Sequence, residues 1–145
     1  MPIAIRQAAS ADVAAIEMFD EFGGNRHREA AAGTCFVAEA DGTIVAYCSY
    51  EPRGLLGQPF LTYLCVRKDR RKQGIASSLI QTVQREAEGR ALISSTEDWC
   101  VDTQRIFERL GWKQVGEISG INKDGSTELF FSIALDEERR RSHEQ

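Results

Sequence analysis

The chain has 145 residues, of which 42% are hydrophobic and 28% charged, which suits one ordinary domain with a single core rather than two. Its formal net charge of -4 disfavours a general attraction to nucleic acid, so any anionic ligand must be met locally. No stretch approaches the about 18 consecutive apolar residues of a membrane span, and Arg6, Gln7 and Asp12 interrupt the N-terminus before an apolar stretch of signal-peptide length forms. We therefore expect a single domain over residues 1–145 that is cytoplasmic and binds neither nucleic acid nor a membrane.

The N-terminal third predicts one strand and one or two helices. Residues 2–8 have the pattern of a short strand, and Ser10 is a candidate N-cap for a helix over residues 11–22. A pair of glycines ends that helix, and a loop or a short second helix follows through Ala32.

The next segment predicts three strands. Two β-rich runs within residues 34–51 are joined by Asp41 and Gly42, which is the strongest short hairpin signal in a sequence. Residues 53–59 carry two glycines and a proline and predict a break in the pattern. Residues 60–66 then form a compact apolar run that predicts a central strand.

The remainder predicts alternating helices and strands. The helix after Gly74 has one apolar stripe, and residues 91–95 resemble a buried strand. A second helix over residues 101–112 ends at Gly111, and two strands follow around a turn at residues 122–126. The charged tail, residues 136–145, predicts a solvated or frayed end. The inward positions expected in the two helices are Ile75, Leu79, Ile80, Val83, Ala87, Val101, Ile106, Phe107 and Leu110. Strands and helices that alternate in this way predict a layered α/β or α+β fold with a mixed sheet.

The four cysteines indicate neither a metal site nor a redox motif. They are Cys35, Cys48, Cys65 and Cys100, and no two of them form a close CxxC or CxxH pair. Since they lie in apolar surroundings of a cytoplasmic chain, we expect free and mostly buried thiols, and no metal.

A basic turn at the start of the third helix predicts an anion site. Residues 67–72 hold five basic side chains in six positions, just before a helix expected to begin near Lys72 or Gln73. The first amides of a helix are unpaired and attract anions, and the small residues Gly74 and Ala76 let a phosphate approach the backbone. The pattern fits a pyrophosphate, whereas the motifs of a Walker loop and of a dinucleotide fold are absent. The alternative is a solvated basic turn in which Gly74 only eases packing.

The residues at this turn resemble the GNAT superfamily of N-acetyltransferases. The family's acetyl-CoA signature, [RQ]xxGx[GA] after a strand with an aliphatic end, appears as RKQGIA at residues 71–76 after TYLCV at residues 62–66. The order of elements and the late segment IFERLGWKQVG, residues 106–116, extend the resemblance over nearly the whole chain. It implies a mixed, mostly antiparallel central sheet of about six to seven strands with helices on both faces.

The resemblance also implies where acetyl-CoA would bind as co-substrate. Backbone groups of the central strand would hold the pantetheine and polarise the thioester carbonyl, and a gap between the strands at 60–66 and 91–95 would admit the pantetheine arm. Amides of the signature, followed by a serine hydroxyl, would hold the pyrophosphate of coenzyme A, and one aromatic side chain could line the thiol end of the channel. The strand residues are Leu64, Cys65 and Val66, and the aromatic residue is Phe107. The residues implied for the pyrophosphate are Arg71, Lys72, Gln73, Gly74, Ile75, Ala76 and Ser77.

The catalytic groups depart from the family pattern. Many members place a tyrosine four residues before the glycine of the late helix as general acid, but this chain has Phe107 before Gly111. The central strand also lacks the carboxylate that some members use as general base. An amine must lose a proton before it attacks, so another group has to accept it. The candidates are Tyr63 and Glu97 first, then Asp98, Glu51 and His27.

Each candidate also has a structural interpretation. Glu97 and Asp98 could cap the following helix, Tyr63 could be a packed strand aromatic, and His27 could face solvent. Covalent acyl transfer through Cys65 or Cys100 is disfavoured because buried cysteines usually behave as small hydrophobes. Two tryptophans, Trp99 and Trp112, are expected to pack, and Phe107 could simply be a core residue.

These observations favour an N-acetyltransferase that moves the acetyl group of acetyl-CoA directly to a primary amine of a small molecule or a peptide. The first alternative is an acyl-CoA-binding regulatory module of the same fold without catalysis, and the second is a phosphate-anchored nucleotide-binding protein. A cationic substrate could be attracted by three acids near the first helix, Glu17, Asp20 and Glu21. An exposed acidic helix face would contain the same residue types. An exposed strand near the end could pair two subunits into a homodimer.

Overall fold

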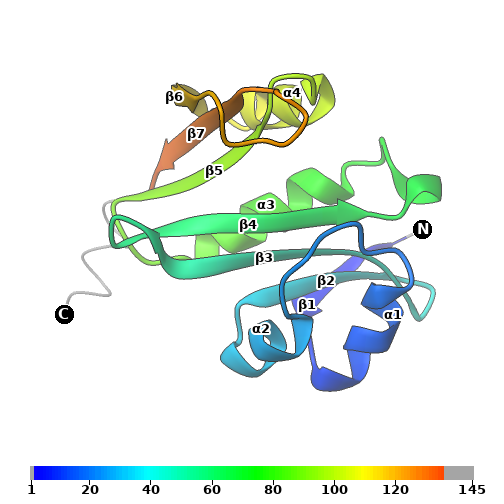
Figure 1. The fold of residues 1–145 in the computed structure, drawn as a ribbon. Helices are drawn as coiled ribbons and strands as arrows, with labels where there is room; N and C mark the ends of the chain where they lie inside the picture. The colour runs from blue at the N-terminus through cyan, green and yellow to red at the C-terminus, as the bar shows by residue number, and fades with distance from the viewer. Residues whose placement is uncertain (1, 136–145) are drawn as a thin grey trace. The chain divides into compact units, whose positions relative to one another are not determined.

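Seven strands in the order β1-β2-β3-β4-β5-β7-β6 and four α-helices make up the fold in the computed structural model, which describes residues 2–135 (Figure 1). The predicted fold class, a mixed and mostly antiparallel sheet with helices, is confirmed. The chain divides into two units, and strands β3 and β4 run through both. Within the described residues, unit 1 comprises 2–51 and 61–86, and unit 2 comprises 52–60 and 87–135. The predicted charged tail lies outside the described residues.

The strands of unit 1 form antiparallel pairs. Strand β1, Ala4–Gln7, pairs with β2, Cys35–Ala40, which pairs with β3, Thr43–Leu55. The predicted hairpin is confirmed, because Asp41 and Gly42 connect β2 to β3 with φ of 52° and 75°, the left-handed values of a tight hairpin turn. Strand β4, Gln58–Val66, includes the predicted central strand.

Helices cover both faces of the unit 1 sheet. The face that carries Val37 and Tyr47 packs against Ile16 of α1, Val13–Glu17, and against Ala30 of α2, Arg26–Ala32. Helix α3, Ile75–Glu86, lies along the sheet (Figure 1) and contacts β1 and β2. Its predicted stripe is buried as expected. The second helix that the sequence left open is therefore present as α2.

The predicted N-cap of the first helix is wrong. Ser10 is exposed and begins a 3-10 turn, Ser10–Asp12, whose N-cap is Ala9. The carboxylate of Asp12 accepts a hydrogen bond from the N–H of Ala9 at 2.7 Å and pairs with Arg6 through two contacts of 2.7 and 2.9 Å. The hydrogen bonds from Arg6 hold the pKa of Asp12 below its usual range. The Asp12 carboxylate, which accepts the N–H of Ala9, therefore takes the capping role predicted for the Ser10 hydroxyl.

Replacement of Asp12 by alanine should lower the free energy of unfolding by about 1 kcal/mol at pH 7, the usual contribution of a cap. The depressed pKa means that this contribution is present above the unfolded value of about 3.9 and is lost as the pH falls through the folded value. Urea unfolding at pH 7 and at pH 2.5 measures the difference. Ser10→Ala is the control and should change stability by less than about 0.5 kcal/mol; the opposite ranking would contradict the cap assignment.

Unit 2 contains a tight hairpin where the sequence predicts a break. Leu56 and Gly57, with φ of 52° and 80°, connect β3 directly to β4, so the segment at 53–59 lies in strand and turn instead of a loop. Strand β5, Ala91–Glu97, pairs with β7, Glu128–Ala134, and β7 pairs with β6, Lys113–Ile118. The predicted strand pair around residues 122–126 is thus confirmed.

The core of unit 2 lies under α4, Val101–Arg109. Phe107 and Phe131 stack with ring centroids 5.3 Å apart, and Trp112 lies 4.6 Å from Phe107. Val101 is predicted to face inward and Trp99 to pack. Both predictions are wrong, because the two side chains are exposed around the start of α4. No helix in the described part of the chain is both long enough and apolar enough to cross a membrane.

Candidate functional site

The signature at residues 71–76 lies in a loop that leads from β4 into α3. After β4 ends at Val66, a 3-10 turn over Lys68–Arg70 brings the chain to the loop. The helix begins at Ile75, three residues later than Lys72, because Lys72 and Gly74 have left-handed φ values of 64° and 82° that a helix cannot contain.

The start of α3 presents unpaired backbone donors. Its first intrahelical bond runs from the N–H of Ser78 to the carbonyl of Gly74 at 3.1 Å, so the amides of Ile75, Ala76 and Ser77 precede that ladder. These donors and the positive end of the helix dipole favour an anion. An added Cβ at Gly74 would meet no atom of the described structure within 4 Å, so the approach to the amides is open there.

Arg71 ties the loop to the strand before it. Its Nε donates to the carbonyl of Val66 at 2.9 Å, and its Nη2 lies 3.4 Å from a carboxylate oxygen of Glu21. The side chain thus turns back toward β4, whereas Lys72 and Gln73 are exposed and can supply positive charge and a polar contact at the loop. Unit 1 therefore brings together the two predicted parts of the coenzyme A site, the end of β4 and the signature loop.

The end of β4 alternates between the two faces of the unit 1 sheet. Cys65 is buried, and its thiol donates to the carbonyl of Phe19 at 3.6 Å on the α1 side. Leu64 is half-buried and Val66 is buried, and by the two-residue alternation of a strand they point to the opposite face.

The cysteine thiols are poor nucleophiles in this environment. Burial raises the pKa of Cys35 to about 12, raises that of Cys48 well above its ordinary value, and raises that of Cys65. The predicted free and mostly buried thiols are confirmed among the described residues, with Cys100 half-buried. A thiol with a raised pKa is rarely a thiolate at neutral pH, which argues against covalent acyl transfer.

Iodoacetamide at pH 8 should therefore modify Cys100 first in the native protein, because it is the most accessible of the four thiols. Intact-mass spectrometry should show one adduct early and four only after unfolding in urea. The variant Cys100→Ser should lose the early adduct. Early modification of a second cysteine in that variant would contradict the burial of the other three.

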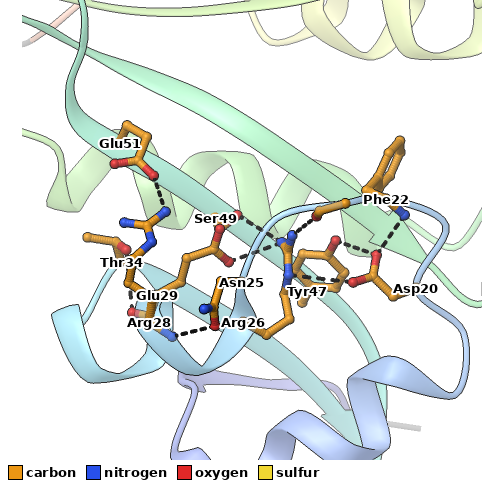
Figure 2. A network of polar contacts seen from close by, with 11 residues as sticks. Asp20, Phe22, Asn25, Arg26, Arg28, Glu29, Thr34, Tyr47, Ser49 and Glu51 are labelled. Atoms are coloured by element: carbon orange, nitrogen blue, oxygen red, sulfur yellow. Dashed lines mark hydrogen bonds and ion pairs between the residues drawn. The ribbon is translucent and has the colours of Figure 1, made fainter.

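A buried ionic network lies on the α1 and α2 side of the unit 1 sheet (Figure 2). Its centre is Arg26, 4% exposed, which pairs with Glu29 at 3.0 Å and with Asp20 at 3.5 Å. The guanidinium also donates to the hydroxyl of Ser49 at 3.4 Å. Tyr47 donates its hydroxyl to Asp20 at 2.6 Å, and burial together with this bond raises the pKa of Tyr47. One buried cation thus serves two carboxylates.

Tyr63, the first candidate catalytic residue, joins this network through its ring. The guanidinium carbon of Arg26 lies 4.4 Å from the centre of the Tyr63 ring and 4.8 Å from that of Tyr47. The ring of Phe22 lies 5.8 Å from that of Tyr63. These contacts support the interpretation of Tyr63 as a packed strand aromatic, and its position directly before Leu64 keeps it a candidate for catalysis.

Glu97, the second candidate catalytic residue, is the last residue of β5 in unit 2. It is half-buried, accepts a hydrogen bond from the Cys100 thiol at 3.3 Å, and stands opposite Glu128 in the β5–β7 ladder. Glu128 accepts from Ser95 at 2.7 Å and from Asn122 at 2.9 Å. The helix-capping interpretation of Glu97 is wrong, because the N-cap of α4 is Cys100, and α4 has no side-chain capping hydrogen bond.

The remaining candidates have ordinary structural positions. The carboxylate of Asp98 accepts the N–H of Thr127 at 3.4 Å and likewise does not cap α4. His27 is exposed on α2, as its solvent-facing interpretation predicts, and Glu51 pairs with Arg28 at 2.8 Å. Phe107, expected at the thiol end of the cofactor channel, is 1% exposed, and its ring contacts are those of a core residue.

Arg26, Glu29 and Glu128 were not predicted from the sequence. Arg26 and Glu29 lie in a charge-rich segment that has the letters of an exposed helix, and only their i,i+3 spacing hints at a pair. Glu128 shows no signal until its strand is paired with β5.

Comparisons with known proteins agree on one family. Residues 31–114 match the family model described as Acetyltransferase (GNAT) domain. A GNAT-family acetyltransferase from Bacillus cereus is 20% identical, with a TM-score of 0.84, and the match covers 94% of this chain and 99% of that one. The Salmonella typhimurium protein yncA, solved with its cofactor acetyl-CoA, is 17% identical over 94% of this chain and 96% of its own, with a TM-score of 0.75. A ribosomal-protein-alanine N-acetyltransferase from Brucella melitensis is 24% identical over 91% and 99%, with a TM-score of 0.77. No curated protein sequence matches this chain.

Proposed function

Because the chain belongs to the GNAT acetyltransferase family, and is thus an acyltransferase with acetyl-CoA as co-substrate, we propose that it transfers the acetyl group directly to a primary amine of a small molecule or peptide. The observation that carries this proposal is the start of α3, where unpaired amides follow the open position at Gly74. We propose further that residues 1–145 act as one acetyltransferase domain in the cytoplasm.

The cofactor residues of the proposal lie at the end of β4 and in the signature loop. Amides from Arg71 to Ala76 and the Ser77 hydroxyl would bind the pyrophosphate, with Lys72 adding positive charge. The side chain of Arg71 supports the site by fixing the loop, because its hydrogen bond to the Val66 carbonyl joins the loop to the strand that would hold the pantetheine. The open space at Gly74 fits a bulky diphosphate group.

Acetyl-CoA supplies an activated thioester. The backbone of Leu64, Cys65 and Val66 would hold its carbonyl, and a fixed amide donor there would stabilise the negative charge that develops when the amine attacks. Holding the two reactants in line would supply much of the remaining rate. Tyr63 or Glu97, with water, would accept the proton of the attacking amine.

Calorimetry with acetyl-CoA and a thiol-release assay with a broad panel of amines test the proposal. We expect acetyl-CoA to bind and coenzyme A to be released in the presence of at least one amine. Binding without release for every amine would instead favour the regulatory module without catalysis. Absence of binding at millimolar acetyl-CoA would overturn the proposed function.

A further inference from the structure

Two aromatic rings lie together next to the proposed thioester strand. Phe22, in the loop between α1 and α2, is 47% exposed, and its ring lies 5.8 Å from the ring of the half-buried Tyr63. Tyr63 directly precedes Leu64, the first residue proposed to hold the thioester. The two rings form one apolar surface within unit 1, which we name the aromatic wall.

The backbone around Phe22 is fixed. The N–H of Phe22 donates to the carboxylate of Asp20 at 3.0 Å, and Arg26 donates to the carbonyl of Gly23. The backbone of Gly24 lies directly against the network, because an added Cβ there would come within 2.4 Å of Arg26 Nη2 and within 2.9 Å of Tyr63 Cε2. Figure 2 shows the Phe22 side chain pointing away from the carboxylate that its N–H contacts. The backbone that carries the Phe22 ring is thus preorganised for a ligand.

The acids of the same loop are already engaged. Asp20 accepts hydrogen bonds from Tyr47 and Phe22 and pairs with Arg26, while Glu21 lies 3.4 Å from Arg71. One face of the Tyr63 ring is also covered by the Arg26 guanidinium, and ring faces are where a second cation would bind. Two of the three acids that suggested a cationic substrate, Asp20 and Glu21, therefore serve the loop's own structure, and only Glu17, exposed at the end of α1, is left of the three. The aromatic wall is the apolar surface that this loop presents next to Leu64.

We propose that the aromatic wall of Phe22 and Tyr63 determines acceptor specificity, so that the enzyme prefers a primary amine on an apolar skeleton to a polyamine. Arg26 acts as a positioning residue, because it contacts the ring of Tyr63 and the loop that carries Phe22. This inference rests on the proposed function and adds the chemical class of the acceptor. The class has two sources, an apolar alkylamine or a peptide whose first residue is apolar.

Two matched pairs of acceptors test the preference. Hexylamine and 1,6-diaminohexane differ only in a terminal ammonium, and Leu-Gly-Gly and Gly-Gly-Gly differ only in the first side chain. We expect kcat/KM to be about tenfold higher for the apolar member of the pair that represents the natural source, which is the lower end of the effect that one methylene produces in an apolar pocket. The pair with the larger ratio separates a small-molecule acceptor from a peptide.

Variants link the preference to the wall. Phe22→Ala should raise KM for the apolar amine about five- to tenfold and leave the Kd for acetyl-CoA unchanged, since we place the ring against the acceptor and not against the cofactor. Tyr63→Leu should reduce the selectivity as well. Met18→Ala removes another exposed apolar side chain near the end of α1 and should not change the ratio of kcat/KM values within either acceptor pair. Selectivity retained in Phe22→Ala, or a preference for the diamine, would overturn the inference.

A binding measurement separates this inference from the proposed function. In amide NMR spectra of the protein saturated with coenzyme A, hexylamine and Leu-Gly-Gly should be titrated separately, and at least one should shift the resonances of Gly23 and Gly24. The diamine and Gly-Gly-Gly should shift them much less. Unchanged resonances with both apolar amines would overturn the aromatic wall, whatever the turnover. Failure of acetyl-CoA itself to bind would instead overturn the proposed function.

Discussion

Gly74→Asp is expected to raise the Kd for acetyl-CoA at least tenfold. The new carboxylate would stand in the open space before the unpaired amides of α3, where we propose the pyrophosphate binds. Two like charges about 4 Å apart repel by about 1 kcal/mol in water, which is about fivefold in Kd, and by several times more near a protein surface, so a loss of tenfold or more is expected for this site. Calorimetry of acetyl-CoA binding to the wild type and the variant measures the change.

Gly125→Asp is the matched control for this prediction. Gly125 has φ of 81°, almost the value of 82° at Gly74, and both glycines have open space where a Cβ would lie. Both variants should therefore lose a similar 1–2 kcal/mol of folding free energy, the usual cost of a left-handed residue with a side chain. Only Gly74→Asp should lose acetyl-CoA. Equal binding by the two variants would remove the signature loop from the proposed cofactor site.

Features coded by a few neighbouring residues could be predicted from the sequence. The Asp41-Gly42 hairpin follows from two residues that accept left-handed φ values, and α3 follows from the spacing of its apolar stripe. The signature loop was also located correctly, because it depends on a glycine between a strand and a helix. These signals act over less than about four turns of helix and need no tertiary partner.

Boundaries and caps were less predictable because two local signals competed. Ser10 has the best side chain for an N-cap, but Asp12 satisfies the Ala9 amide and Arg6 at once, and the pairing with Arg6 requires β1 to be in place. In the same way Leu56 is an unfavourable residue for a left-handed turn, yet the two strands that it joins are long enough to impose one. In both places strand pairing, rather than the local sequence, determines the observed conformation.

The polar part of the candidate site could not be predicted, because it is assembled from segments far apart in the chain. Arg26 becomes buried only when its guanidinium packs against the rings of Tyr47 of β3 and Tyr63 of β4. Glu97 and Glu128 face each other only after β5 pairs with β7. A single sequence shows these residues as ordinary charges and aromatics.

Arg26→Met is expected to lower the free energy of unfolding by about 3–5 kcal/mol at pH 7, because it leaves the carboxylates of Asp20 and Glu29 buried without their cation. Glu29 is 1% exposed, and burial already raises its pKa. A carboxyl whose folded pKa is raised is destabilised in its ionised form, so its cost grows as the pH rises above the unfolded value of about 4.3. The loss should therefore be larger at pH 7 than at pH 5, as measured by urea unfolding.

Two further variants separate charge from packing in this network. Arg28→Met is the matched control on the same helix, since the side chain of Arg28 is 55% exposed and its surface pair with Glu51 should contribute little to stability. Adding Glu29→Gln to Arg26→Met removes one uncompensated charge and should recover part of the stability at pH 7 but little at pH 5. If the double variant is no more stable than Arg26→Met at either pH, the loss comes from the packing of the guanidinium against the two tyrosine rings, and Arg26 holds the aromatic wall by contact rather than by charge.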